Sequence, residues 1–217
     1  MDEKVVLQMK GVKKYFPGVK ALDGVDFELR KGEIHALLGE NGAGKSTLIK
    51  ILTGIYSMTE GSIHIKGEEV HMKSVKDARD NRIAAIHQEI CLVPYISVAR
   101  NVYLGRELKT KLGLMDDKTM EEETQKLLDR LGMDIDAAKE VRQYSIAQQQ
   151  LIEIAKALAL DAEILLMDEP TSSLTEKEVT KLFETIRRLK DNGTSIIYIS
   201  HRMEELFELS DRVTVLR

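Results

Sequence analysis

The sequence has a single cysteine, three prolines and no tryptophan among its 217 residues. One thiol, Cys91, excludes an internal disulfide framework and is typical of a reducing compartment. The longest apolar runs, such as Ile164–Met167, are far too short to cross a bilayer. The charged start Met1–Lys4 does not resemble the apolar stretch of a signal peptide. We therefore expect a compact intracellular protein that does not span a membrane.

The composition excludes further classes of protein. Hydrophobic residues make up 43% of the chain and charged residues 31%, which is ordinary for a globular protein and excludes disordered and collagen-like classes. A chain of this length can bury a sizeable core without metal or disulfide staples. The formal net charge of −4 lacks the basic footprint of phosphate-backbone recognition, so no nucleic-acid partner is expected.

Hydrophobic patterning predicts an α/β fold. The predicted strands are 25–29, 34–38, 62–65, 164–168, 194–200 and 212–216, and the predicted helices are 46–52, 117–131, 147–160 and 175–189. Strands separated by helices indicate a mainly parallel sheet, to which 62–65 adds a hairpin edge. We expect one domain, in which about 1–90 and 161–217 form the α/β core with an antiparallel β-subdomain and about 91–160 form an inserted helical subdomain.

A glycine-rich segment between a predicted strand and a predicted helix matches the pattern G-x-x-x-x-G-K-[ST] of a P-loop. It runs Gly39, Glu40, Asn41, Gly42, Ala43, Gly44, Lys45, Ser46, and Thr47 follows. Glycines let backbone N–H groups converge on phosphate oxygens, Lys45 neutralises the β- and γ-phosphates, and the Ser46 hydroxyl suits Mg²⁺. The alternative is an ordinary glycine-rich turn with a surface lysine. The pattern in this context favours the phosphate site.

Two acids follow the buried strand 164–168. Asp168 is a candidate Mg²⁺ ligand, and Glu169 is a candidate general base for an attacking water. The alternative is a strand that ends in solvated acids. Because a P-loop is present in the same chain, we prefer the catalytic interpretation.

These residues, together with the absence of a guanine-reading N-K-x-D motif, lead to one family. The chain resembles the ATP-binding subunits of ABC transporters over essentially its whole length. The resemblance implies ATP and Mg²⁺ as cofactors. It identifies Gln88 as the Q-loop glutamine near Mg²⁺ and water, and His201 as the switch histidine that contacts the γ-phosphate. Phe16 matches the aromatic residue that stacks on adenine, with Tyr15 the near alternative.

One motif departs from the family pattern. The signature L-S-G-G-Q reads Tyr144-Ser145-Ile146-Ala147-Gln148 here, so both glycines have gained side chains. In the family this helix start contacts the nucleotide of an opposite domain, which implies that Ser145 and Gln148 act in trans. Ser145 is also a plain helix N-cap candidate, and both interpretations hold together.

The run Ser145–Leu158 and the segment Phe16–Leu22 are similar to the N-terminal half of tandem ATPases for monosaccharide import of the ribose, galactose and xylose type. This similarity implies a second ABC domain after Arg217, membrane-spanning permease subunits and, indirectly, a solute-binding protein as partners. It places the chain at the cytoplasmic face of the membrane as a peripheral subunit. We expect the isolated fragment to be mostly monomeric.

Two other functions stay open at this point. A soluble ABC-type ATPase in translation or DNA repair would usually carry coiled-coil insertions or basic arms, which the sequence lacks. A weakly hydrolysing regulatory module is disfavoured by Glu169 and His201 and mildly favoured by the altered signature.

Overall fold

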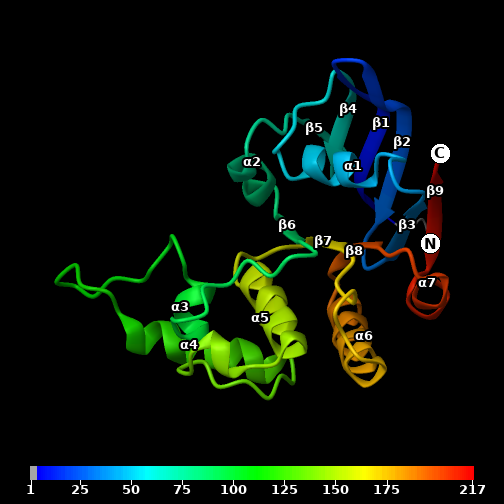
Figure 1. Cartoon of the computed structure of the whole chain (residues 1–217). Helices are drawn as coiled ribbons and strands as arrows, with labels where there is room; N and C mark the ends of the chain where they lie inside the picture. The colour runs from blue at the N-terminus through cyan, green and yellow to red at the C-terminus, as the bar shows by residue number, and fades with distance from the viewer. Residues whose placement is uncertain (1–3) are drawn as a thin grey trace. The chain divides into compact units, whose positions relative to one another are not determined.

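The computed structural model describes residues 4–217, which divide into two compact units (Figure 1). The first unit comprises the residues up to Ala85 together with Ala162–Glu169 and Leu189–Arg217. The second unit comprises Ile86–Asp161 and Pro170–Arg188. Each unit has its own buried side chains and is described by itself.

The first unit contains a four-stranded sheet of order β2-β1-β4-β5, in which every neighbouring pair is antiparallel. Its strands are β1 (Val5–Phe16), β2 (Val19–Arg30), β4 (Glu60–Ile65) and β5 (Glu68–Val70). Pro17 and Gly18 connect β1 to β2, and Gly18 has φ 77°. A proline followed by a residue of positive φ is the combination that a type II turn requires. The β4–β5 pair confirms the hairpin edge that the sequence predicts.

A five-stranded sheet of order β6-β7-β8-β3-β9 carries the parallel part of the fold. Its strands are β3 (Ile34–Gly39), β6 (Ile83–Ile86), β7 (Ile164–Asp168), β8 (Ser195–Ile199) and β9 (Arg212–Leu216). β8 pairs in parallel with both β3 and β7, and β3 also pairs in parallel with β9. The helices α1 (Lys45–Leu52), α2 (Val75–Asp80), α6 (Glu176–Asp191) and α7 (Met203–Leu209) connect these strands along the chain.

The core of the first unit joins both sheets through α1. Leu48 and Leu52 of α1 are fully buried in one cluster with Leu7 of the antiparallel sheet and Leu37 and Ile197 of the parallel sheet. Burying α1 on this cluster fixes its start at Lys45, directly after the turn that leaves β3. Packing thus sets the direction in which the glycine-rich segment enters its helix.

The second unit is helical and contains α3 (Val98–Val102), α4 (Asp117–Arg130), the 3₁₀ turn Val141–Gln143 and α5 (Ile146–Leu158). Ser97, Asp116 and Ser145 each cap a helix by accepting a backbone N–H of its first turn. The sequence places Leu151 and Leu158 on the buried face of α5. The structure corrects this, because Ile152 and Ala157 are buried instead and the two leucines are half-buried.

The architecture confirms the predicted α/β fold with a parallel sheet, an antiparallel sheet and a helical insertion. The sequence prediction has no counterpart for β1, β6, α2, α3, α7 and the 3₁₀ turn Val141–Gln143. Across residues 4–217, no helix combines the length and the apolar character that crossing a bilayer demands.

A buried polar cluster ties β9 to β2 and β3. His35 is only 3% exposed, and its Nε2 lies 2.8 Å from the Thr214 hydroxyl. Arg212 donates to both carboxylate oxygens of Glu33 and to the carboxylate of Glu28. Burial lowers the pKa of His35, and the nearby Arg212 guanidinium lowers it further against the opposing field of Glu33. The folded state therefore favours the neutral imidazole more than the unfolded chain does.

This cluster makes the fold sensitive to mild acid. Below the ordinary histidine pKa of about 6.5 the unfolded chain takes up a proton that folded His35 resists, so the free energy of unfolding falls as the pH falls. We expect a loss of at most about 1.4 kcal/mol per pH unit from this one group. Urea denaturation between pH 7.5 and 5.5 should show a shallower slope for His35→Gln than for the native chain. The exposed His71→Gln is the matched control and should keep the native slope, and equal slopes for all three proteins would refute the account.

Candidate functional site

The carboxyl ends of three parallel strands meet at one edge of the five-stranded sheet. Gly39 ends β3 and begins the glycine-rich segment, Asp168 ends β7, and His201 follows β8 by two residues. Because β8 lies between β3 and β7, and all three run in the same direction, these ends share one edge. Open parallel sheets bind ligands outside this edge. The sheet therefore brings the glycine-rich segment, Asp168 and His201 to one edge.

The glycine-rich segment is a tight loop closed by Lys45. The Lys45 ammonium donates to the carbonyl oxygens of Gly39 at 2.6 Å and Glu40 at 3.0 Å. Gly44 has φ 97°, and a Cβ built there would lie 2.5 Å from the Ala21 carbonyl oxygen and from a Leu22 methyl carbon. Only glycine fits this position. The loop thus holds a cation at its centre and the N-terminus of α1 behind it, which is an arrangement for binding anions.

A hollow of about 710 Å³ lies against this loop, and its volume suits a small-molecule ligand. Residues 39–43 line one wall, and His201 and residues 215–217 line others. Every lining residue belongs to the first unit. The predicted phosphate loop and the predicted switch histidine therefore face the same space.

Glu169 is held in an unusual backbone conformation. Its φ is 49°, in the left-handed region that a residue with a side chain rarely adopts, while its N–H still donates to the Ile199 carbonyl oxygen at 3.0 Å. One Glu169 carboxylate oxygen lies 3.2 Å from Nδ1 of His201. Glu169 is mostly buried, whereas His201 is largely exposed. Such strain concentrates at functional sites, and here it turns the carboxylate toward the histidine.

Ser46 and Asp168 supply hard oxygen donors at the same sheet edge. Ser46 is exposed in the first turn of α1, and Asp168 is half-buried at the end of β7. A hydroxyl and a carboxylate beside a phosphate loop match the oxygen ligands that Mg²⁺ takes together with substrate phosphates. The donor chemistry of the two residues therefore fits the predicted metal.

The two candidate aromatic residues have different surroundings. The Phe16 ring packs edge-on against Tyr56, with ring centroids 5.3 Å apart, and the Lys14 ammonium lies 5.0 Å from its centroid. The Tyr15 hydroxyl instead donates to Asp23 at 2.6 Å. Phe16 is half-buried and its ring is oriented by neighbours, which favours it over Tyr15 as a stacking platform. The contact with Tyr56 was not predicted, because Tyr56 lies far from Phe16 in the chain.

Gln88, Ser145 and Gln148 belong to the second unit. Gln88 is exposed, and with Pro94, Gln149 and other residues it lines a hollow of about 580 Å³ in this unit. Ser145 and Gln148 form a closed capping box at the start of α5, because the Gln148 side chain accepts the Ser145 N–H at 3.1 Å and the Ser145 hydroxyl accepts the Gln148 N–H at 3.3 Å. Ile146 is 49% exposed at the first position of the helix.

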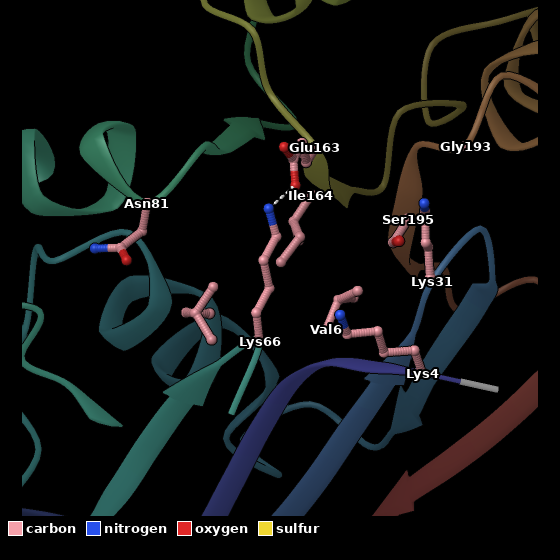
Figure 2. A pocket seen from close by; sticks show the side chains of 10 residues that line it. Lys4, Val6, Lys31, Lys66, Asn81, Glu163, Ile164, Gly193 and Ser195 are labelled. Atoms are coloured by element: carbon pink, nitrogen blue, oxygen red, sulfur yellow. Dashed lines mark ion pairs between the residues drawn. The ribbon is translucent and has the colours of Figure 1, made fainter. Parts of the chain in front are cut away.

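Another cavity, of about 270 Å³, lies at the opposite edge of the sheet, where the strands begin (Figure 2). Among the residues that line this cavity, Lys31, Glu163 and Gly193 come shortly before β3, β7 and β8 in the chain. Figure 2 shows Lys66 reaching across to Glu163, and the two charged groups are 2.5 Å apart. The residues that line this cavity include none of the predicted nucleotide-site residues. The nucleotide hypothesis therefore concerns the hollow that residues 39–43 and His201 line.

Comparison with known proteins gives a consistent result. The family model described as ABC transporter matches residues 22–172. The chain is 54% identical over 212 residues to the ribose import ATP-binding protein of Caldanaerobacter subterraneus subsp. tengcongensis, which covers 98% of this chain and 43% of that protein. It is 51% identical over 211 residues to the ribose import ATP-binding protein of Bacillus licheniformis, which covers 97% of this chain and 43% of that protein. The chain thus spans about two fifths of the length of these relatives.

A solved structure agrees with the fold. The ADP conformation of an ATP-binding cassette of an ABC transporter superposes with a TM-score of 0.86 at 26% identity, covering 98% of this chain and 87% of that one. The fold class expected from the sequence is confirmed, and so is the resemblance on which that expectation partly rests.

The close approach at Gly44 gives a test of the loop geometry. Gly44→Ala combines left-handed strain with a collision, whereas Gly42→Ala has φ 89° with open space around the new methyl group. We expect Gly42→Ala to lower the free energy of unfolding by about 1 kcal/mol and Gly44→Ala by about 1–3 kcal/mol more. Urea denaturation of the two variants measures the difference. Equal losses would show that Ala21 and Leu22 do not confine the loop.

Proposed function

Starting from the fact that the chain belongs to the ABC transporter family, we propose that it is an ATP-binding and ATP-hydrolysing domain. One observation carries the proposal: the Lys45-closed loop, the Glu169 carboxylate and His201 all belong to one sheet edge with a hollow beside it. An anion-binding loop explains binding, and a carboxylate in contact with an imidazole explains hydrolysis.

The whole glycine-rich loop would take part in binding ATP. The backbone N–H groups of Gly39–Ser46 and of Thr47 at the start of α1 would hold the phosphates, and Lys45 would exchange its two carbonyl contacts for β- and γ-phosphate oxygens. Phe16 would stack on the adenine ring. Ser46 and Asp168 would hold Mg²⁺, which neutralises charge on the phosphates when bound.

Hydrolysis would centre on Glu169. Its carboxylate would accept a proton from water as the water oxygen bonds to the γ-phosphorus, and the bond between that phosphorus and the β–γ bridging oxygen would break to release ADP and phosphate. His201 would donate a hydrogen bond to the γ-phosphate and, through its contact with Glu169, hold that carboxylate in place. Positioning and electrostatics carry most of such a reaction.

The transported solute and the partners follow from the relatives. Because proteins of 51–54% identity are named ribose import ATP-binding proteins, we propose that this domain drives import of a monosaccharide. A second ABC domain, in the same or a partner chain, would supply its own signature helix to this site. Ser145 and Gln148 would serve the other site in trans. Permease subunits would dock on the domain at the cytoplasmic face of the membrane. On the opposite face they would receive the solute from a solute-binding protein, which is an indirect partner of this domain.

Removal of the Lys45 ammonium should weaken nucleotide binding strongly. Lys45→Ala deletes the one side-chain cation that closes the loop, so we expect fluorescent ATP to bind at least about tenfold more weakly, since a charge-assisted contact is worth about 1.5–3 kcal/mol. Equilibrium titration with Mg²⁺ present measures this. Lys76→Ala, an exposed lysine on α2, is the control and should bind as the native chain does. Native affinity in Lys45→Ala would remove this lysine from the site.

Replacement of the carboxylate by an amide should separate binding from hydrolysis. Glu169→Gln keeps the size of the side chain but cannot accept a proton, so we expect ATP affinity to persist while single-turnover hydrolysis falls about 10²-fold or more. Glu204→Gln, an exposed acid on α7, should hydrolyse ATP at the native rate. If Glu169→Gln also turned over normally, another group would have to be the base.

A further inference from the structure

The segment between α3 and α4 is a small, ordered hairpin that stands apart from the helices on either side of it in Figure 1. The Thr110 N–H donates to the Leu114 carbonyl oxygen at 2.8 Å, and the Gly113 N–H donates to the Thr110 carbonyl oxygen at 2.9 Å. Lys109 pairs with Met115, and Gly113 has φ 80°. A turn followed by a left-handed glycine is a defined hairpin loop, so the tip has a fixed shape.

The tip exposes apolar side chains that the fold does not use. Leu112 is 87% exposed, Leu114 67% and Met115 47%. These three large apolar side chains lie within residues 112–115 of one narrow hairpin loop and form a wedge, which we call the apolar tip. Exposed apolar side chains of this kind bind a membrane by entering the boundary between its headgroups and acyl chains.

The charges on the hairpin are separated along its length. Residues 108–115 contain Lys109 and Lys111 and no acid, and neither lysine makes an ion pair among residues 4–217. Acidic residues lie at the base of the hairpin, where their carboxylates accept hydrogen bonds. Glu107 accepts the Gly105 N–H at 2.9 Å, and Asp117 accepts two hydrogen bonds from Arg100 at 2.7 Å each. Both contacts lower the pKa of the carboxyl group that accepts them.

From these observations we propose that the hairpin at 108–115 is a lipid-contacting element: Leu112, Leu114 and Met115 enter the headgroup region of an anionic membrane while Lys109 and Lys111 bind lipid phosphates. Apolar groups flanked by unpaired lysines are the chemistry that interfacial insertion into an anionic leaflet requires. The contact goes beyond ATP binding and hydrolysis, and it needs neither. One small wedge gives weak, reversible binding, which suits a second attachment beside a protein partner.

The absence of tryptophan makes the test direct. Leu112→Trp in the full 217-residue chain places a single indole at the tip, and Phe207→Trp places one at a site of similar exposure, 78%, on α7. With vesicles of phosphatidylglycerol and phosphatidylcholine, we expect Leu112→Trp emission to shift to the blue and to be quenched by lipids brominated on their acyl chains. Phe207→Trp should show neither change. No shift at position 112, or the same shift at both positions, overturns the proposal.

Charge variants separate the lysine contribution from general electrostatics. Lys109→Gln combined with Lys111→Gln in the Leu112→Trp background should weaken vesicle binding about 30-fold, because each basic residue near an anionic surface contributes a factor of about five. Lys126→Gln combined with Lys139→Gln removes two charges from the same unit, where both are paired with acids, and should weaken it much less. Equal losses, or a Leu112-dependent self-association that replaces vesicle binding, contradict the proposal. ATP binding should be native in all of these variants, so the result stands apart from the nucleotide hypothesis.

Discussion

The parallel pairing of β3, β8 and β7 is the constraint on which the site depends. Each strand ends in a chemically different group, namely the glycine-rich loop, the histidine and the paired acids. Strand direction alone brings these ends to one edge, and β8 sets the spacing because it lies between the other two. A change of register by one residue along β8 would turn its side chains to the other face and separate His201 from Glu169. The positions of the site residues therefore depend on backbone hydrogen bonds between the strands, in which no functional side chain takes part.

Local motifs could be read from the sequence, and contacts across the chain could not. The loop at Gly39–Ser46 and the acids at Asp168 and Glu169 each lie in one short segment whose flanking hydrophobic pattern is regular. β1 was missed because the register of its pairing with β2 shifts at several points, which breaks the strict alternation that predicts a strand. The short helices α2, α3 and α7 offer too few turns for a helical period to show.

The contact between Glu169 and His201 illustrates the same limit more sharply. No pattern in the sequence indicates that Glu169 will adopt φ 49° while its N–H donates to the Ile199 carbonyl oxygen, because this hydrogen bond joins residues far apart in the chain. The altered signature gave the opposite case. Its serine predicted the N-cap that the structure contains, whereas the return contact from the Gln148 side chain was not predicted, because Gln148 was interpreted only as a contact in trans. The capping box occupies the N–H groups of Ser145 and Gln148. At this helix start, another molecule could therefore bind the N–H groups of Ile146 and Ala147.

The central claim is that the Lys45-closed loop recognises a polyphosphate tail. Calorimetric titration of the chain with ATP, ADP and AMP in the presence of Mg²⁺ tests it most directly, since the three ligands share the base and sugar. The account predicts measurable heat and affinity for ATP and ADP, and a loss of at least about tenfold for AMP, which cannot reach the loop amides and Lys45 together. Equal affinity for all three nucleotides, or no binding of ATP at millimolar concentration, would contradict it.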